Sequence, residues 1–276
     1  MKLSLCINTF NEEKNIHLPL DSAIDLVDEV IIIDGSSKDK TVVIAKSYGA
    51  KVKTFVVDNP RNFLTNKQRA IERASGEWIL QLDADEALSE DLKKEIATLL
   101  NCYIAKRQPN NETMKQCNNK FIGYNIPRKN FFLTRFLMKG GVYPDYVLRL
   151  YKKKNAKFDL KDLHENVKVS GEIGYFKNPI LHYADPNFSR YLLRWDRYTT
   201  FDAENLHQRF KVQSSMFKVF LMFIDYFFCK PVYWFLKTYF RHLGLMDGFP
   251  GFVFSLFSAI RFWVIYIKWY SLRNNK

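Results

Sequence analysis

Residues 78–86 read Trp78-Ile79-Leu80-Gln81-Leu82-Asp83-Ala84-Asp85-Glu86, an apolar run that passes directly into three acidic residues. The run is typical of a buried strand, and open α/β sheets bind ligands beyond the carboxyl ends of their strands. Asp83 and Asp85 are two residues apart, so on extended backbone their side chains point the same way. Carboxylate oxygens suit a hard divalent cation. The stretch predicts a metal site and a phosphate-bearing substrate, although an acidic turn before a helix is the alternative interpretation.

Strand and helix patterns alternate on the amino-terminal side of this stretch. Strands are expected at Leu3–Ile7, Val30–Ile33, Val52–Val57 and Trp78–Leu82, and helices at about Glu12–Val27, Thr41–Tyr48, Phe63–Ala74 and Ser89–Leu100. This order predicts a parallel sheet with right-handed crossovers, in which all strands end at one edge. Polar clusters at residues 8–11, 34–39, 58–62 and 83–86 then share that edge. Their convergence is stronger evidence for a site than any one cluster.

The remainder of the chain is less regular. Residues 101–120 are polar and indicate a surface insertion, whereas Phe121–Pro127 and Val147–Tyr151 regain strand character. Phe131–Met138 is apolar and basic, which favours a helix or a loop. We expect a catalytic domain over residues 1–204, with a nucleotide-binding half at about 1–100 and an acceptor half at about 121–204, followed by a helical region over 205–276.

Composition narrows the class of protein. The 276 residues are 47% hydrophobic, enough for a sizeable core, and the formal net charge of +13 implies an anionic partner. The four cysteines form no C-x-x-C pair and no cluster, which indicates neither a zinc site nor a disulfide framework and favours a reducing cytosol. The apolar start at Leu3–Ile7 is too short for a secretion signal.

The loop after the first strand excludes two common nucleotide-binding turns. Asn8-Thr9-Phe10-Asn11-Glu12 contains no glycine, so the dinucleotide fingerprint is absent, and the sequence contains no P-loop. Phosphates must then be neutralised in another way, and carboxylates at Asp83 and Asp85 offer a metal for that purpose. After the second strand, Asp34 can accept hydrogen bonds from a base or a ribose; the alternative is a polar turn in which Asp39 or Lys40 caps the next helix.

Three ordered motifs resemble family 2 glycosyltransferases of the GT-A fold. They are Cys6–Glu13 (CINTFNEE), Asp34–Thr41 (DGSSKDKT) and Ala74–Glu86 (ASGEWILQLDADE), and they cover roughly the first hundred residues. Downstream, residues 143–145 (YPD), 149–151 (RLY), 164–165 (HE), His182 and 244–248 (GLMDG) resemble the bacterial branch of lipopolysaccharide inner-core beta-1,4-glucosyltransferases.

The resemblance implies a nucleotide-sugar site at the sheet edge. Thr9 and Glu12 would line the nucleotide pocket, and Asp34 would bind the uracil or the ribose. Asp83 would contact the ribose or a metal-bound water. Lys67 is a basic candidate for the phosphates, as is Arg61.

It also implies the metal ligand and the base. Asp85 would bind Mg²⁺ or Mn²⁺ that bridges the diphosphate, with Asp83 and His182 as further possible ligands. Glu165 would take the proton of the acceptor hydroxyl as general base, with Asp145 as the second candidate. One base and one metal suffice for displacement with inversion at the anomeric carbon.

Two departures from the family pattern bear on the substrate. The second strand ends in Ile33-Asp34, where many members carry two aspartates. The Q-x-x-R-W motif of processive synthases is only half present, because Arg194-Trp195 follow Tyr191 in place of glutamine. This indicates addition of a single sugar.

The last quarter of the chain is basic and aromatic. From His207 to Lys276 it carries ten Lys and Arg residues against Asp225 and Asp247. The segment Phe249–Ile267 is long enough to span a bilayer, but Arg261 lies in its interior. We expect helices that lie in the membrane interface, with salt-sensitive binding, and a span or a protein-facing pack as alternatives. The apolar runs are too continuous for a nucleic-acid surface.

Together these patterns predict an enzyme. We expect it to move one hexose, with glucose favoured, from a UDP-sugar to a lipid-linked oligosaccharide acceptor, as a peripheral protein on the anionic cytoplasmic face of the inner membrane. A non-catalytic membrane-binding module with a GT-A-like fold and a metal-dependent nucleotidyltransferase are the alternatives.

Overall fold

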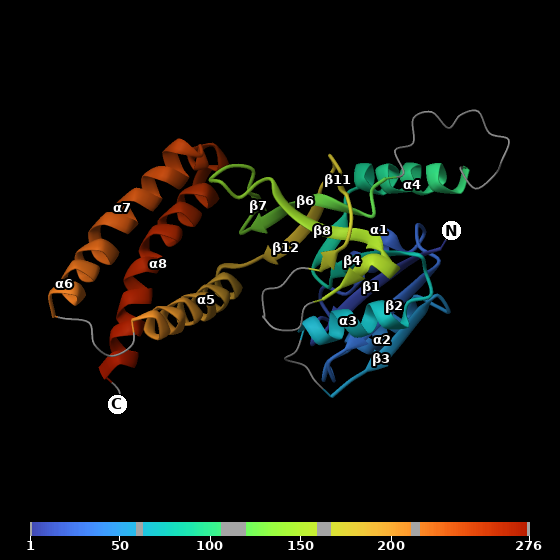
Figure 1. The fold of residues 1–276 in the computed structure, drawn as a ribbon, viewed down its shortest axis with the longest axis horizontal. Helices are drawn as coiled ribbons and strands as arrows, with labels where there is room; N and C mark the ends of the chain where they lie inside the picture. The colour runs from blue at the N-terminus through green and yellow to red at the C-terminus, as the bar shows by residue number, and fades with distance from the viewer. Residues whose placement is uncertain (1, 59–62, 106–119, 159–166, 211–215, 275–276) are drawn as a thin grey trace. The chain divides into compact units, whose positions relative to one another are not determined.

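The computed structural model describes residues 2–58, 63–105, 120–158, 167–210 and 216–274. They divide into two compact units, one made of residues 1–128 and 145–182 and the other of residues 129–144 and 183–276 (Figure 1). The boundaries fall inside two strands, β6 (Gly123–Phe132) and β12 (Ile180–Asp185). The domain boundary expected near Glu204 lies within helix α5 (Phe188–Arg209) and stays a prediction.

The first unit begins with the predicted alternation of strands and helices. Its elements are β1 (Leu3–Thr9), α1 (His17–Ala23), β2 (Glu29–Asp34), α2 (Thr41–Ser47), β3 (Val52–Val56), α3 (Phe63–Arg73), β4 (Trp78–Asp83), β5 (Glu86–Leu88) and α4 (Glu90–Ala105). Strands β3, β2, β1 and β4 are adjacent in that order and run parallel. The fold class expected from the sequence, an α/β GT-A fold, is confirmed.

Antiparallel strands complete the sheet. Strand β8 (Asp145–Lys152) pairs with β4 and with β6, and β12 pairs with β5. Smaller strands are β7 (Arg135–Phe136), β9 (Ala156–Lys157), β10 (Lys168–Val169) and β11 (Ile173–Tyr175). The expectation of a helix or loop over residues 131–138 is wrong at its start, because Phe131↔Phe136 and Phe132↔Arg135 pair as a β-hairpin. The segment is too short and too aromatic for a stable helix.

Burial on both faces explains the apolar strand sequences. In β2, Val30 and Ile32 join one core cluster with residues of α1, α2 and α4, while Ile31 and Ile33 join a second cluster with residues of α3. A strand covered by helices on both sides gains from apolar residues at every position. The run of β-branched residues in β2 is therefore a direct consequence of its central place in the sheet.

Local signals set the ends of the helices. Gly49 has a φ of +94°, a conformation that glycine adopts without strain, and it ends α2 as expected. Ser89 accepts a hydrogen bond from the Leu92 backbone NH and begins α4, as its sequence predicts. Helix α1 starts later than expected, because residues 12–16 form a turn in which Asn15 and Ile16 donate to the Glu12 carbonyl.

Cys6 and Cys229 are free thiols, but Cys102 is disulfide-bonded, so the expectation of unpaired cysteines is wrong there.

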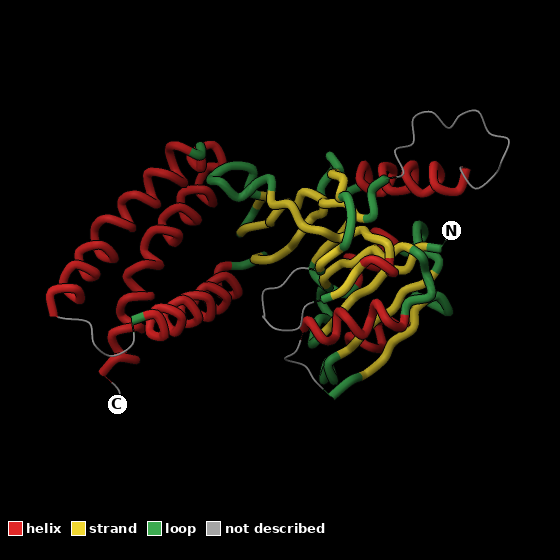
Figure 2. Tube along the Cα trace, in the orientation of Figure 1, coloured by secondary structure: helices red, strands yellow, loops and turns green. Residues whose placement is uncertain are grey.

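The second unit is mainly helical (Figure 2). After α5, a long helix runs from Met216 to Arg241 as α6 (Met216–Ile224), a π-helical stretch (Asp225–Cys229), α7 (Lys230–Phe235) and a second π-helical stretch (Leu236–Arg241). A 3₁₀ turn (Gly244–Asp247) leads into α8 (Gly248–Asn274). By length and composition, the two helical segments Met216–Arg241 and Gly244–Asn274 are each able to cross a membrane.

Candidate active site

The sheet brings three of the predicted polar clusters together. Parallel pairing places Thr9 beside Asp34 and Asn8 beside Asp83, so the carboxyl ends of β1, β2 and β4 meet at one edge. In the fourth cluster, residues 59–62 lie outside the described residues. The edge that the sequence predicts as the site is therefore formed by adjacent strands.

Two loops at this edge are tied to each other by hydrogen bonds. The Asn11 NH donates to Ser37 Oγ at 2.8 Å, and the Lys38 NH donates back to Asn11 Oδ1 at 2.8 Å. The Glu12 NH donates to Thr41 Oγ1 at 2.8 Å. The Glu12 carboxylate also accepts from the side chain of Asn15 at 2.6 Å. Side chains on both loops are thus held in fixed positions at the strand ends.

Asp34 orders its own turn. Its side chain is fully buried and accepts hydrogen bonds from Thr9 Oγ1 at 2.9 Å, from the Ser37 NH at 2.8 Å and from Ser37 Oγ at 2.5 Å. Buried carboxylates need such donors. These contacts fix the turn after β2, and the roles of Thr9 and Asp34 toward a nucleotide stay predictions.

Asp83 lies between two cations. Lys67 Nζ of α3 approaches its Oδ1 at 2.6 Å, and Arg149 Nη2 of β8 approaches its Oδ2 at 2.5 Å. Burial alone would raise the pKa of Asp83, but the charges of Arg149 and Lys67 outweigh it and hold that pKa far below its usual range. Asp83 is ionised at any physiological pH.

Glu86 is the buried centre of a larger charge network. Its side chain is 0% exposed; it accepts from Arg149 Nη2 at 2.7 Å and from the Asp83 NH at 2.9 Å, and lies 3.4 Å from Arg128 Nη1. Arg128 of β6 in turn donates to Asp145 Oδ2 through Nη2 at 2.7 Å and Nε at 3.0 Å. We define these six side chains as the strand-end network: Lys67, Asp83, Arg149, Glu86, Arg128 and Asp145.

The sequence analysis did not assign a role to Glu86 and did not identify Arg128. It named Arg149 only as part of a motif that resembles the family. One signal was present in the sequence. Arg149 stands between Leu148 and Leu150 in an apolar strand, and a buried arginine requires a carboxylate partner. Which carboxylate it meets depends on β8 pairing with β4, a long-range contact that the local pattern does not specify.

Asp85 faces a histidine of β12. His182 Nε2 lies 3.5 Å from Asp85 Oδ1, because His182 of β12 pairs with Glu86 of β5. Both side chains retain some exposure, at 16% for Asp85 and 12% for His182. Within the described part of the chain, no group of three or more His, Cys, Asp or Glu side chains is placed to hold a metal. A carboxylate and an imidazole nevertheless fit as two protein ligands of a divalent cation whose other ligands are substrate oxygens and water.

Comparison with known proteins decides the family. The sequence profile of glycosyl transferase family 2 matches residues 4–156, which include β1 to β4 and the strand-end network. The chain belongs to glycosyl transferase family 2. It is thus a glycosyltransferase, and the recognition made from the three sequence motifs is confirmed.

Relatives match this glycosyltransferase over most of its length. An uncharacterized glycosyltransferase of Rickettsia bellii is 29% identical over 94% of this chain and 82% of its own. The lipopolysaccharide core biosynthesis glycosyltransferase LpsC of Rhizobium meliloti is 25% identical over 94% of this chain and 88% of its own. The match to LpsC confirms the expected resemblance to lipopolysaccharide core enzymes.

A solved structure shows the same fold. The mannosyltransferase PcManGT from Pyrobaculum calidifontis, in complex with GDP-Man and Mn2+, aligns with a TM-score of 0.55 and 10% identity, covering 100% of this chain and 88% of that one. At this identity the likeness concerns the fold alone, and it agrees with the GT-A architecture expected from the sequence.

Of the two candidate bases of the glycosyltransferase, Asp145 lies within the described residues and Glu165 does not. Glu165 lies outside the described residues, as does Arg61, so the roles given to them stay predictions. Asp145 begins β8, is 35% exposed and is held by Arg128. The second candidate base therefore belongs to the same network as Asp83.

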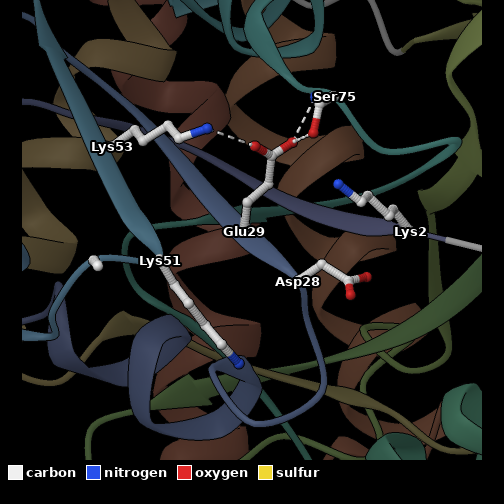
Figure 3. Close-up of a pocket in the computed structure, with 7 residues that line it drawn as sticks. Lys2, Asp28, Glu29, Lys51, Lys53 and Ser75 are labelled. Carbon is white, nitrogen blue, oxygen red and sulfur yellow. Dashed lines mark hydrogen bonds and ion pairs between the residues drawn. The ribbon is translucent and has the colours of Figure 1, made fainter.

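A cavity of about 320 Å³ lies at the opposite, amino-terminal edge of the strands (Figure 3). Its lining includes Glu29, which accepts from Ser4 Oγ at 2.7 Å and from Ser75 Oγ at 2.8 Å. Lys51, also in the lining, donates to the Val27 carbonyl at 3.2 Å. These charged groups are used to join β1, β2 and the turn before β4. The cavity therefore lies at the edge of the sheet opposite the strand-end network.

Proposed function

We propose that the chain transfers one hexose, with glucose as the favoured sugar, from a UDP-sugar to a lipid-linked glycan such as a lipopolysaccharide or lipooligosaccharide core. Transfer would invert the anomeric configuration and would require Mn²⁺ or Mg²⁺. The observation that carries the proposal is the end of β4, where Asp83, Asp85 and Glu86 meet Lys67, Arg149 and His182.

Asp85 and His182 would hold the divalent cation. When bound, the cation supplies Lewis-acid stabilisation of the negative charge that develops on the leaving diphosphate. The mannosyltransferase of the same fold was solved with GDP-Man and Mn2+, which supports testing a metal here. Asp83 would contact the ribose or a metal-bound water, while Thr9, Glu12 and Asp34 would line the nucleotide pocket.

Lys67 and Arg149 would bind the diphosphate through exchange of partners. In the structure both cations are balanced by Asp83, and Glu86 also balances Arg149. The donor brings negatively charged phosphates, and the divalent cation brings positive charge. The phosphates could then pair with Lys67, while the cation would compensate the carboxylates of Asp83 and Asp85. Charge-assisted hydrogen bonds of this kind are about twice as strong as neutral ones.

The acceptor hydroxyl needs a carboxylate to take its proton as it attacks. Glu165 is the proposed base, and Asp145 is the second candidate because Arg128 fixes its carboxylate. If Glu165 is the base, Glu165→Gln abolishes transfer while Asp145→Asn retains it. The reverse result assigns the role to Asp145.

The acceptor and the location follow from the relatives and from the helical region. LpsC, which matches most of the chain, is named for lipopolysaccharide core biosynthesis. The segments Met216–Arg241 and Gly244–Asn274 have the length and composition for contact with a membrane. We place the enzyme on the cytoplasmic face of the inner membrane as a peripheral protein.

The proposal is tested by measuring UDP release from UDP-glucose with a lipid-linked core acceptor, with Mn²⁺, with Mg²⁺ or with a chelator. Chelation should stop the reaction, and Asp85→Ala should slow it by about a hundredfold or more. The matched control is Asp91→Ala, which removes an exposed carboxylate in the first turn of α4. Equal rates for Asp85→Ala and Asp91→Ala would refute the metal role, and a screen of other UDP-sugars would identify the donor.

A further inference from the structure

The helices of the carboxyl-terminal region form a hairpin. The long helix Met216–Arg241 packs along α8 through aromatic pairs, among them Phe227 with Tyr266 at 5.5 Å and Phe235 with Phe252 at 6.2 Å (Figures 1 and 2). Trp263 Nε1 also donates to the Phe227 carbonyl at 2.9 Å. We call this pair of helices the hairpin. This packing buries one face of each helix. The exposed faces therefore determine what the hairpin can bind.

The outward side of the long helix is apolar along its length. Between residues 220 and 240, its exposed side chains are Phe220, Leu221, Phe228, Cys229, Val232, Tyr233, Leu236 and Phe240. None of these is charged. An apolar side chain recurs every four residues, at Phe228, Val232, Leu236 and Phe240. The π-helical stretch after Phe235 keeps these side chains on the same face of the helix. Soluble monomers rarely expose a continuous apolar surface of this extent.

Two cations in the same stretch do not interrupt this surface, because they fold against aromatic rings. Lys230 Nζ lies 3.6 Å from the centre of the Tyr226 ring and 2.8 Å from Asp225 Oδ2. Lys237 lies over Trp234 at 4.4 Å. Cation–π contacts of this kind gain strength where water is scarce.

Arg261, which argued against a membrane span in the sequence, also lies against aromatic rings. Its guanidinium lies 4.9 Å from the ring centre of Phe262 and 5.5 Å from that of Trp234, across the hairpin. Its charge therefore faces aromatic rings of both helices. The cost of bringing this part of α8 close to lipid is lower than the sequence alone indicates.

Both ends of the hairpin are tied to polar segments of the same unit. At the turn, buried Asp247 accepts from the backbone NH groups of Met138 at 3.0 Å and Lys139 at 2.7 Å. At the other end, Lys268 Nζ donates to Asp196 Oδ1 of α5 at 2.6 Å. A spanning hairpin would have to carry one of these polar attachments through the hydrocarbon. The hairpin is therefore suited to lie along a surface.

We infer that the apolar side of the hairpin docks into the interface of a lipid bilayer, with both helices in the membrane plane and with apolar burial as the main source of affinity. Lys218 and Arg241, at the two ends of the exposed stretch, are placed to reach anionic headgroups. The inference deepens the membrane location proposed above and rests on it. It replaces the expectation of a mainly electrostatic, salt-sensitive contact.

The test is co-sedimentation of the full chain with phosphatidylcholine vesicles and with vesicles that also contain phosphatidylglycerol. We expect binding to both, stronger to the anionic vesicles, and retained in 1 M NaCl, where charge attraction is largely screened. The double variant Val232→Asp, Leu236→Asp should bind at least about tenfold more weakly. The matched control Val43→Asp alters an exposed valine on α2 of the first unit and should bind normally.

Other outcomes would overturn the inference. Binding only to anionic vesicles, with release in 1 M NaCl, would make the contact electrostatic. Resistance to extraction at alkaline pH, with protection of the turn from protease, would show a span. If the chain self-associates without binding vesicles, and Val232→Asp abolishes that association, a second copy of the chain covers the surface. Because no donor, metal or acceptor is present, these results are separable from failure of the proposed reaction, and circular dichroism with urea unfolding verifies that the variant is folded.

Discussion

Both edges of the parallel sheet bury a carboxylate at a strand end, but the two carboxylates have different kinds of partner. At the amino edge, Glu29 is held by Ser4 Oγ at 2.7 Å, by the Ser75 NH at 2.5 Å and by Ser75 Oγ at 2.8 Å. At the carboxyl edge, Asp83 is held by Lys67 and Arg149.

We interpret the amino edge as a structural site and propose the carboxyl edge as the functional one. Short neutral donors from β1 and from the turn before β4 fix Glu29 in place, and its cationic partner Lys53 is largely exposed. Long cationic side chains can leave Asp83 for a phosphate without loss of their own charge compensation. The four predictions below test this contrast, beginning with the largest effect.

The largest effect is expected from Arg149→Leu. The substitution leaves Glu86 fully buried with its charge less well compensated, by Arg128 Nη1 at 3.4 Å and the Asp83 NH at 2.9 Å. Removing one partner of a buried ion pair costs about 3–5 kcal/mol. The midpoint of urea unfolding should fall accordingly. Adding Glu86→Gln to Arg149→Leu should recover part of the loss, and a double variant as unstable as the sum of the single variants would contradict the coupling.

A pH-dependent effect is expected at the other edge. Burial opposes ionisation of Glu29, but hydrogen bonds from Ser4 and Ser75 prevail and lower its pKa from 4.5 to about 2. Because the folded-state pKa is depressed, the stability from this group is complete above pH 4.5 and is lost as the pH falls toward 2.

The measurement is urea unfolding of the wild type and of Glu29→Gln between pH 7 and pH 2. The shift corresponds to about 3 kcal/mol, so the two proteins should differ most above pH 4.5 and converge below it. UDP release at pH 7 should be normal for the folded variant. A difference in stability that does not depend on pH would show that the Glu29 charge is not what the hydrogen bonds stabilise.

A third prediction concerns catalysis. Lys67→Met should change stability little, because Arg149 still compensates Asp83. It should weaken donor binding by about tenfold to a hundredfold, the value of a charge-assisted hydrogen bond of about 1.5–3 kcal/mol. KM for the UDP-sugar and the affinity for UDP in the presence of Mn²⁺ are the quantities to measure. Unchanged affinity for UDP would show that Lys67 serves only to hold Asp83.

The parts of this picture that the sequence predicted are those that depend on local pattern. The strands β1 to β4 follow from apolar runs, and the meeting of Asp34, Thr9 and Asp83 follows from their parallel order. What was missed depends on pairing across the sheet. Strand β5 was not predicted, yet it pairs with β12 and brings His182 to Asp85.

The hairpin shows the same limit in another form. Arg261 in the sequence is a charge inside an apolar stretch, and only the packing of two helices places Trp234 against it. Local charge counts assign a cost to each cation, whereas the partners that reduce this cost come from residues far along the chain.

The smallest effect is expected from Lys53→Met, the counterpart of Lys67→Met at the amino edge. Lys53 Nζ lies 3.2 Å from Glu29 Oε2, but its side chain is 56% exposed, against 16% for Lys67. An exposed ion pair contributes at most about 1 kcal/mol, and three other hydrogen bonds hold Glu29. Stability should fall slightly, less so in high salt, with no change in KM for the UDP-sugar. If Lys53→Met impaired donor binding as much as Lys67→Met, partner type would not distinguish the functional edge of the sheet from the structural one.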